Sequence, residues 1–265
     1  MKRRAVVSLL PLLPLIFTTA ACAPNDATEA TASSDDSAAP SSSSVRAVAP
    51  YLEELERELL FGNIWERPGL SKRDRTMITL AVTQGLYQPE EFGVYLRRAL
   101  DEGMTTEEIA EVVTHVALYA GWPTGSAVSR VATEVYQERG LAFPDPSEAV
   151  SLEIDLRGGR PAYPVAPYLS ALTSTLLYGD PDGVWARSGL SPRDRSMITV
   201  AVQQALYETQ QLRGHIGRAL NNGVTQDELV ELITHVTFYA GWPTGSNAAR
   251  VAEEVFTERG LRVRP

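Results

Sequence analysis

Cysteine is almost absent from this sequence, with one residue, Cys22, among 265. A single cysteine cannot form a disulfide within one chain, so no cross-link of this kind can stabilise the monomer. Histidine is scarce too, because the whole chain has only His115, His215 and His235. Any chemistry that uses imidazole is therefore confined to these three positions.

Positive charge is also in short supply. The chain has 24 Lys and Arg against 33 Asp and Glu, which gives a formal net charge of −9. An acidic protein repels nucleic acid phosphates, so we expect no nucleic acid partner. An anionic ligand would have to be bound by local arginines. With 44% hydrophobic residues, the chain has enough apolar material for a globular core.

A long uninterrupted apolar run is missing, and the nearest approach to one stands at the start of the chain. Three basic residues at positions 2–4 precede the run Ala5 to Phe17, which is shorter than a membrane-spanning helix needs and contains two prolines. This pattern predicts an export signal. The Thr-Ala-Ala sequence before Cys22 resembles the lipobox of bacterial lipoproteins, in which the cysteine carries the lipid. We therefore expect a lipid-anchored protein of the cell envelope, on the periplasmic side or the outer face of a membrane. The alternative is cleavage by an ordinary signal peptidase and a protein secreted free.

Low-complexity segments divide the chain. After the expected signal peptide (residues 1–21), residues 22–48 are rich in Ser, Ala, Asp and Thr and read as a disordered tether. Residues 141–166 contain several prolines and a Gly-Gly pair, which is typical of a linker. These segments leave two candidate domains, residues 49–140 and 167–265.

The two candidate domains are copies of one another. The stretch THVALYAGWPTGS at residues 114–126 recurs as THVTFYAGWPTGS at residues 234–246. From residues 65–140 to residues 185–260 the register holds without a gap, and more than half of the positions are identical. Two copies are too few for a solenoid, so we expect two small domains packed as an internal pseudo-dimer.

Each copy is expected to be entirely helical. Helix starts are marked by Ser or Thr with an acidic residue three positions later, and helix ends by glycine. The start pairs are Ser71/Asp74, Thr105/Glu108, Ser191/Asp194 and Thr225/Glu228, and the glycines are Gly103, Gly140, Gly223 and Gly260. Apolar spacing of three and four residues between these signals favours helices throughout, and no segment reads as a strand.

One predicted helix carries a candidate catalytic histidine. Within residues 226–240, His235 has Tyr239 one turn above it and Glu231 one turn below. An imidazole with a phenol and a carboxylate in reach can be held in one tautomer and act as a general acid or base. The alternative is a structural histidine whose ring nitrogens are satisfied at a helix interface.

The copies differ at positions that bear on this choice. Tyr95 stands in the first copy where His215 stands in the second, and Ala127 stands where Asn247 stands. The second copy is therefore expected to be the chemically equipped half, with its histidines facing one pocket. By the same reasoning, His115 in the first copy is expected to matter far less.

Two arginines lie in the first turn of one predicted helix, where the helix dipole disfavours positive charge. They are Arg193 and Arg195. We expect one of them to form a salt bridge with a neighbouring aspartate. The other could bind a carboxylate through two hydrogen bonds.

The strings LSPRDRSMITVAV and GHIGRALNNGVTQDELVELITHVTFYAGWPTGSNAARVAEEVF resemble the carboxymuconolactone decarboxylase family, which has the alkylhydroperoxidase D-like fold. The resemblance covers nearly all of the second copy and, more weakly, the first. It implies an all-α unit that assembles into rings, commonly of six units. A chain with two units is then expected to form a homo-oligomer, as a trimer.

The resemblance also implies a chemistry. One branch of the superfamily uses a Cys-x-x-Cys pair, which this chain lacks. The other branch decarboxylates 4-carboxymuconolactone without a metal or an organic cofactor. By position, Arg195 would hold a substrate carboxylate, while His215 and His235 would serve as proton donor and charge stabiliser in either order. Tyr239 would help to orient the lactone, and the further candidates for substrate binding are Arg193, Asn247 and Trp242.

The sequence is compatible with three functions. The leading one is a cofactor-free lyase acting on a small carboxylated lactone or a related enolisable acid. The second is a non-catalytic envelope protein that binds a small carboxylate or serves as a scaffold. The third, a peroxidase assigned through fold alone, lacks its cysteine pair.

Overall fold

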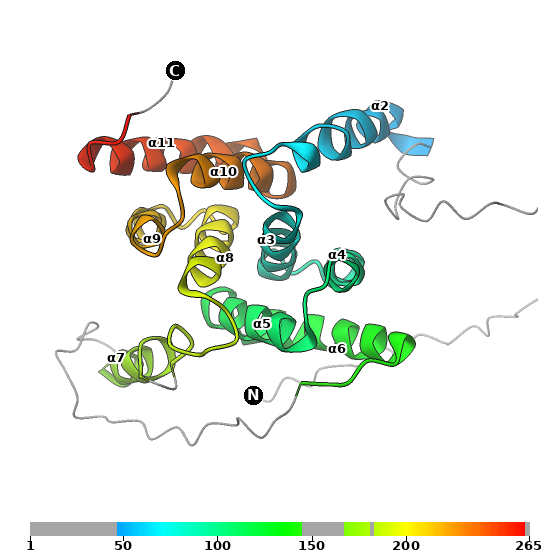
Figure 1. Ribbon diagram of the computed structural model, residues 1–265, viewed down its shortest axis with the longest axis horizontal. Helices are drawn as coiled ribbons and strands as arrows, with labels where there is room; N and C mark the ends of the chain where they lie inside the picture. The colour runs from blue at the N-terminus through cyan, green and yellow to red at the C-terminus, as the bar shows by residue number, and fades with distance from the viewer. Residues whose placement is uncertain (1–46, 145–166, 181–182, 263–265) are drawn as a thin grey trace, which may run out of the picture. The chain divides into compact units, whose positions relative to one another are not determined.

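The computed structural model describes residues 47–144, 167–180 and 183–262 (Figure 1), all of which lie in one compact unit. The expected signal peptide, Cys22, and most of the expected tether and linker lie outside the described residues. Among the helices that are described, none is long and apolar enough to cross a membrane.

The first copy is built from four main helices that follow a short N-terminal helical segment. That segment comprises α2 (Pro50–Leu55), a π-helical stretch (Glu56–Phe61) and a 3₁₀ turn (Ile64–Glu66). The main helices are α3 (Lys72–Gly85), α4 (Pro89–Asp101), α5 (Thr106–Ala120) and α6 (Trp122–Arg139).

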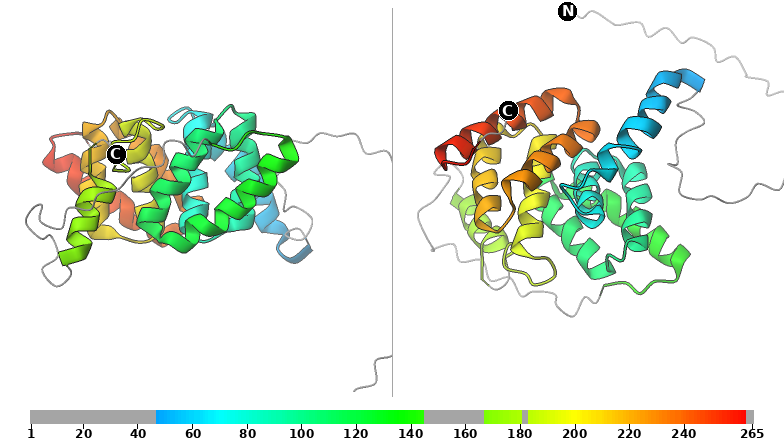
Figure 2. Two further views of the ribbon diagram at one scale, coloured as in Figure 1. Left: turned by 90° about the horizontal axis from the view of Figure 1, so that it is seen from below. Right: turned by 45° about the horizontal axis from the view of Figure 1, so that its top comes forward.

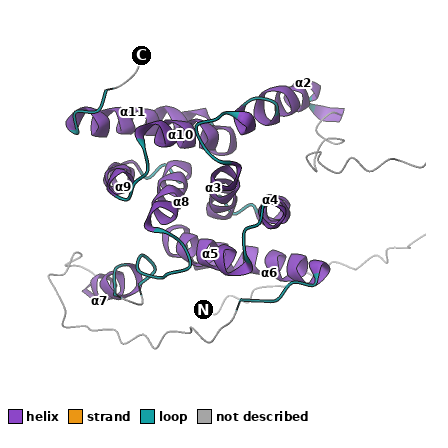
Figure 3. Cartoon of the chain, in the orientation of Figure 1, coloured by secondary structure: helices purple, strands orange, loops and turns teal. Residues whose placement is uncertain are grey.

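The second copy repeats this order. Its N-terminal segment comprises α7 (Pro167–Leu172) and a π-helical stretch (Thr173–Leu177). Its main helices are α8 (Pro192–Ala205), α9 (Thr209–Asn221), α10 (Gln226–Ala240) and α11 (Trp242–Glu258). Throughout the described ranges the regular structure is helical, without a strand, as the sequence predicts (Figure 3).

The caps expected from the sequence are present. The Ser71 and Ser191 side chains each accept a hydrogen bond from the backbone N–H of the aspartate three residues on, at 3.0 Å. Thr105 and Thr225 form full capping boxes with Glu108 and Glu228. These contacts satisfy N–H groups that a helix start leaves without an intrahelical partner.

The Gly-Trp-Pro sequence is a corner between two helices. Gly121 (φ 99°) and Gly241 (φ 92°) occupy a backbone region that strongly favours glycine. Each glycine ends one helix, and the proline that follows falls in the first turn of the next, where its missing N–H costs nothing. The recurrent motif thus joins α5 to α6, and α10 to α11.

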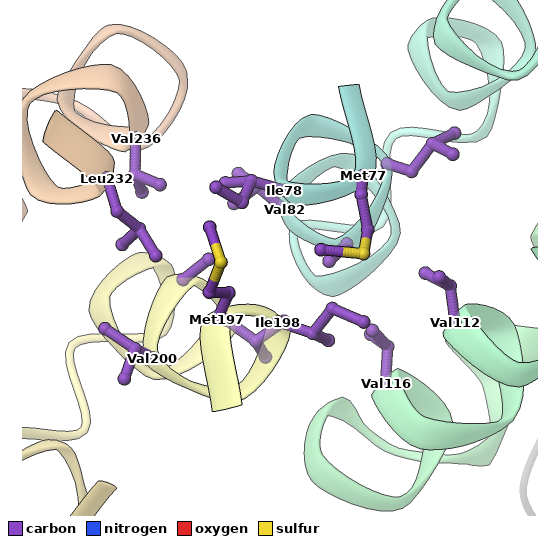
Figure 4. Packing of buried hydrophobic residues seen from close by; sticks show 14 of the residues in the cluster. Met77, Ile78, Val82, Val112, Val116, Met197, Ile198, Val200, Leu232 and Val236 are labelled. Atoms are coloured by element: carbon purple, nitrogen blue, oxygen red, sulfur yellow. The ribbon is translucent and has the colours of Figure 1, made fainter. Parts of the chain in front are cut away.

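The two copies share one core. Helices α3 and α8 lie side by side at the centre, and α5 and α10 each pack against both of them (Figures 1 and 2). Side chains of all four helices meet there, among them Met77, Ile78, Met197 and Ile198, which are fully buried (Figure 4). Burial of one such side chain contributes about 1.5–3 kcal/mol. The chain is thus an internal pseudo-dimer in which α10 of the second copy contacts α3 of the first.

Candidate functional site

The packing of the four central helices brings each histidine of the repeated motif against the other copy. His235 on α10 places its Nε2 2.9 Å from the Thr79 hydroxyl on α3. His115 on α5 places its Nε2 2.7 Å from the Thr199 hydroxyl on α8. Both imidazoles are fully buried. Each therefore belongs to a group of residues drawn from both copies.

We name these two groups after their histidines. The His115 cluster consists of Glu111, His115 and Tyr119 from the first copy with Trp185, Arg187, Arg195, Thr199, His215 and Arg218 from the second. The His235 cluster consists of Glu231, His235 and Tyr239 from the second copy with Trp65, Arg67, Arg75, Thr79, Tyr95 and Arg98 from the first.

The expectation that His215 and His235 face one pocket of the second copy is wrong. The ring of His215 lies 5.6 Å from that of Tyr119 and 6.0 Å from that of Trp185, within the His115 cluster. The reason is the packing of α10, which turns His235 towards α3 of the other copy, whereas α9 packs on α8 and α11. The histidine that accompanies His215 is His115, which was expected to matter less.

The threonines fix the tautomers of the buried histidines. Thr199 Oγ1 donates its single hydrogen to the Arg195 carbonyl at 2.8 Å, so it must accept from His115 Nε2. The neutral His115 ring therefore carries its proton on Nε2 and a lone pair on Nδ1. Thr79 fixes His235 in the same way through the Arg75 carbonyl.

The imidazoles are neutral at physiological pH. Burial, with Arg195 and then His215 nearby, lowers the pKa of His115 to about 3. Burial, with Arg75 and then Arg98, lowers the pKa of His235 to about 3. Burial and Arg218 lower the pKa of the half-buried His215 to about 4. All three rings carry a lone pair that is able to accept a proton.

Arg195 is the charged group at the centre of the His115 cluster. Its guanidinium is fully buried, and NH2 donates to Glu111 Oε2 at 2.7 Å and to the Arg187 carbonyl at 2.8 Å. Burial favours the protonated form of Glu111, but hydrogen bonds from Arg187 and Arg195 outweigh it and hold its pKa below the ordinary value. Glu111 is thus an ionised carboxylate that orients Arg195.

Several buried nitrogens of the His115 cluster have no hydrogen-bond partner among the described residues. They are His115 Nδ1, His215 Nδ1, and Nε and NH1 of Arg195. The His235 cluster differs, because there His235 Nδ1 faces Arg75 NH1 at 3.5 Å and Arg75 Nε alone stays without a partner. Buried polar groups are normally paired, so the unpartnered nitrogens make the His115 cluster the stronger candidate for a site that receives a polar ligand.

Tyr239 belongs to the cluster without His215. Its hydroxyl accepts from Trp65 Nε1 at 2.8 Å and bonds the Tyr95 hydroxyl at 2.9 Å. Its counterpart in the His115 cluster is Tyr119, whose hydroxyl accepts from Trp185 Nε1 at 2.8 Å. Burial raises the pKa of both tyrosines, that of Tyr239 to about 12, so both hydroxyls stay protonated. Sequence reasoning missed Tyr119 and Trp185 because only the packing reveals which copy each side chain faces.

Arg193, named as a candidate for substrate binding, is engaged in ion pairs outside both clusters. It contacts Asp74 at 3.0 Å and Glu228 at 2.5 Å, and it also lies 3.5 Å from the neighbouring Asp194. The expected salt bridge between one arginine and its neighbouring aspartate is thus present at Arg193, while carboxylate binding by Arg195 stays a prediction.

The two remaining candidates lie apart from the buried histidines. Trp242 is 63% exposed and packs edge-on against Phe238. Asn247 Nδ2 donates to Thr209 Oγ1 at 3.0 Å, and its Oδ1 accepts from Arg250 at 3.2 Å. The bond to Thr209 ties α11 to the first residue of α9, the helix that carries His215, whereas the bond from Arg250 lies within α11. Asn247 therefore supports the position of α9.

Comparison with known proteins agrees with the resemblance found in the sequence. The profile of the Carboxymuconolactone decarboxylase family matches residues 50–134 and again residues 181–254. The chain belongs to the carboxymuconolactone decarboxylase family. Each match covers most of one copy of the repeat, so the tandem duplication consists of two units of this family.

Characterised relatives of this carboxymuconolactone decarboxylase family protein include two named as decarboxylases. One is 4-carboxymuconolactone decarboxylase of Acinetobacter baylyi, 49% identical over 78 residues, which is 29% of this chain and 58% of that protein. The other is nitrosuccinic acid decarboxylase of Metarhizium robertsii, 39% identical over 72 residues, which is 27% of this chain and 50% of that protein. The aligned part thus spans about half the length of each relative.

Proposed function

We propose that this protein is a decarboxylase of small carboxylic acids, with the His115 cluster as its active site. The observation that carries the proposal is the set of unpartnered nitrogens on Arg195, His115 and His215. Free guanidinium donors in a buried position suit a carboxylate or another anionic oxygen. The two relatives named as decarboxylases support the same reaction class.

The two relatives' names point to a substrate class. The name 4-carboxymuconolactone describes an unsaturated lactone that bears a carboxyl group, and the name nitrosuccinic acid describes a dicarboxylic acid with a nitro group next to a carboxyl group. In both acids an electron-withdrawing group can receive the electrons that decarboxylation releases. We therefore expect the substrate to be a small acid that contains its own electron acceptor. Decarboxylation of such an acid needs no added oxidant or reductant.

Arg195 would stabilise the charge that the reaction moves. When the bond between the substrate carbon and its carboxylate breaks, carbon dioxide leaves and the electron pair passes to the lactone carbonyl or nitro oxygen. Arg195 Nε and NH1 are free donors for that oxygen, and Glu111 holds the guanidinium in place through NH2. A donor fixed in a buried site is more effective than one that must reorganise during the reaction.

The histidines would complete the step by supplying a proton to carbon. An anionic substrate beside neutral imidazoles raises their pKa, which favours proton uptake. His215 is the partly exposed member, so it can take a proton from solvent, deliver it to the carbanion and return to the neutral form. His115 Nδ1 presents its lone pair inside the cluster, and once it takes up a proton it can donate a hydrogen bond to an oxygen of the substrate. Each turnover then consumes one proton and releases one carbon dioxide.

The test is release of carbon dioxide from 4-carboxymuconolactone, nitrosuccinate and a panel of related acids. With a substrate that the wild type turns over, His115→Gln and Arg195→Gln should each lower kcat/KM by about 100-fold or more. His235→Gln is the matched control, because it removes the equivalent side chain from the other cluster, and it should leave turnover near the wild-type value.

Two results would contradict the proposal. In one, the folded protein binds small carboxylates but releases no carbon dioxide from any acid of the panel, which favours a binding protein. In the other, His235→Gln abolishes turnover while His115→Gln retains it, which would place the chemistry in the His235 cluster.

A further inference from the structure

Eight of the nine residues that define the His235 cluster are identical to their counterparts in the His115 cluster. Glu231, His235 and Tyr239 correspond to Glu111, His115 and Tyr119, and the Trp, Thr and three Arg positions are also identical. The geometry repeats as well, since the histidine to threonine distances are 2.9 and 2.7 Å and the tryptophan to tyrosine hydrogen bonds are both 2.8 Å. The single exception is Tyr95, which stands in the place of His215.

Tyr95 occupies the position that the shorter imidazole leaves open. Its ring stacks on Trp65 with a centroid distance of 5.8 Å, and its hydroxyl bonds the Tyr239 hydroxyl at 2.9 Å. His215 stacks on Trp185 at 6.0 Å but leaves its Nδ1 without a partner among the described residues. The Tyr95 hydroxyl is thus a partner of Tyr239, whereas in the His115 cluster the Tyr119 hydroxyl pairs with Tyr178, and His215 Nδ1 has no partner among the described residues.

The accessibility of the two clusters differs accordingly. Trp65 is 2% exposed and Tyr95 is 6% exposed, whereas Trp185 and His215 are both partly exposed. The Arg98 guanidinium lies 3.7 Å above Trp65, closer than the 4.7 Å between Arg218 and Trp185. The aromatic members of the His235 cluster are therefore more deeply buried than Trp185 and His215, although at the edge of that cluster Arg67 is more exposed (44%) than its counterpart Arg187 (27%).

We propose that the His235 cluster is a second site of the same design for small carboxylates, and that Tyr95 keeps it closed to ligand in this protein. This inference rests on the proposed function of the His115 cluster. One residue then decides whether the protein has one working site or two, because the base, the arginine and the carboxylate that orients it are already in place around Tyr95.

Activity provides the first test, with a substrate that the wild type decarboxylates. His215→Tyr should lower turnover by about 100-fold or more, because a positioned acid contributes that much. Adding Tyr95→His to His215→Tyr should restore turnover to at least about a tenth of the wild-type value, because the acid is then regained in the other cluster. The matched control is Tyr95→Phe with His215→Tyr, which removes the same hydroxyl without supplying an imidazole and should stay inactive.

The second test measures occupancy without turnover. Succinate, an unreactive dicarboxylate, is titrated against protein with ¹⁵N-labelled histidine, and the ring signals are followed by NMR. In the wild type the signals of His115 and His215 should shift while that of His235 stays fixed. In the Tyr95→His variant the signal of His235 should shift as well.

The outcomes separate this inference from the proposed function. If the histidine signals of the wild type respond to succinate but the protein decarboxylates no acid, the proposed reaction is refuted. The NMR titration of the Tyr95→His variant then still decides whether Tyr95 keeps ligand out of the His235 cluster. The inference is overturned if His235 responds in the wild type, or stays silent in a folded Tyr95→His variant. It is also overturned if the Tyr95→Phe, His215→Tyr control regains activity, or if succinate shifts no histidine signal of the wild type.

Discussion

At the scale of single residues, the buried histidines of this protein are neutral and carry free lone pairs. Burying them in this form lowers the free energy of unfolding at acidic pH. His115 and His235 are fully buried and remain neutral because burial, with a neighbouring arginine, disfavours the imidazolium. Each ring is positioned by one threonine that donates to the backbone and accepts from Nε2. A proton added to either ring would create an unpaired buried charge beside a guanidinium.

We therefore predict that stability falls as pH falls below neutrality. The pKa of each buried histidine is about 3 in the folded chain, below its ordinary value of 6.5, so near pH 6 the unfolded chain binds protons that the folded chain does not. The free energy of unfolding should drop by about 1 kcal/mol per buried histidine between pH 7 and pH 5.5. Urea denaturation at the two pH values measures this change. His235→Gln should remove one histidine's share, and an unchanged urea midpoint in the wild type would refute the prediction.

At the scale of helices, the ends of α3 and α8 are joined by a reciprocal pair of ion contacts. Arg73 contacts Asp194 at 3.2 Å and Arg193 contacts Asp74 at 3.0 Å, so each copy supplies one arginine and one aspartate to the other. The guanidiniums also reach Glu108 and Glu228 of the two capping boxes. These contacts connect four helix starts through charge-assisted hydrogen bonds.

This network leads us to predict a structural role for Arg193. Arg193→Met should lower the free energy of unfolding by about 1–2 kcal/mol, because it leaves partly buried carboxylates without their partner. Turnover in the remaining folded protein should stay close to that of the wild type. Thermal melting and a kcat/KM measurement decide the matter together, and a large rise in KM with unchanged stability would instead return Arg193 to substrate binding.

Helices were predictable from the sequence because their signals are local. Ser71, Thr105 and their counterparts mark helix starts through contacts within three residues, so the caps and the corner glycines could be read directly. The site was only half predictable. His215, Arg195 and the difference between Tyr95 and His215 were visible in the sequence, but the partner of His215 was not. The partner of His215 depends on whether α5 of the first copy or α10 of the second copy packs beside it. Both helices carry the same apolar pattern, so the sequence gives no preference for His115 or His235 as that partner.

At the scale of the whole molecule, the two copies behave as one folded body. The core side chains of α3 and α8 interleave, and each histidine cluster needs residues from both copies. Neither copy by itself contains a complete set of the residues that surround a buried histidine.

Cutting the chain between the copies should therefore leave the protein assembled. We predict that a protease site introduced between residues 150 and 160 can be cleaved without loss of turnover, because the halves remain joined through the shared core. Size-exclusion chromatography should show both fragments in one peak, which separates only in denaturant. Dissociation into two folded, inactive fragments would contradict the shared core.

The sharing of residues across the copies also limits how the protein can diverge. In a dimer of identical chains, any substitution appears in both symmetry-related sites at once, so one site cannot change while its twin is preserved. Here the two subunit equivalents are encoded separately within one chain, and a change such as histidine to tyrosine at one position alters a single cluster. Each copy still supplies three residues to one cluster and six to the other, so a change in the packing of either copy reaches both clusters. In the fused chain, single side chains can therefore differ between the two copies. The packing of the helices must stay the same in both copies, because both clusters depend on it.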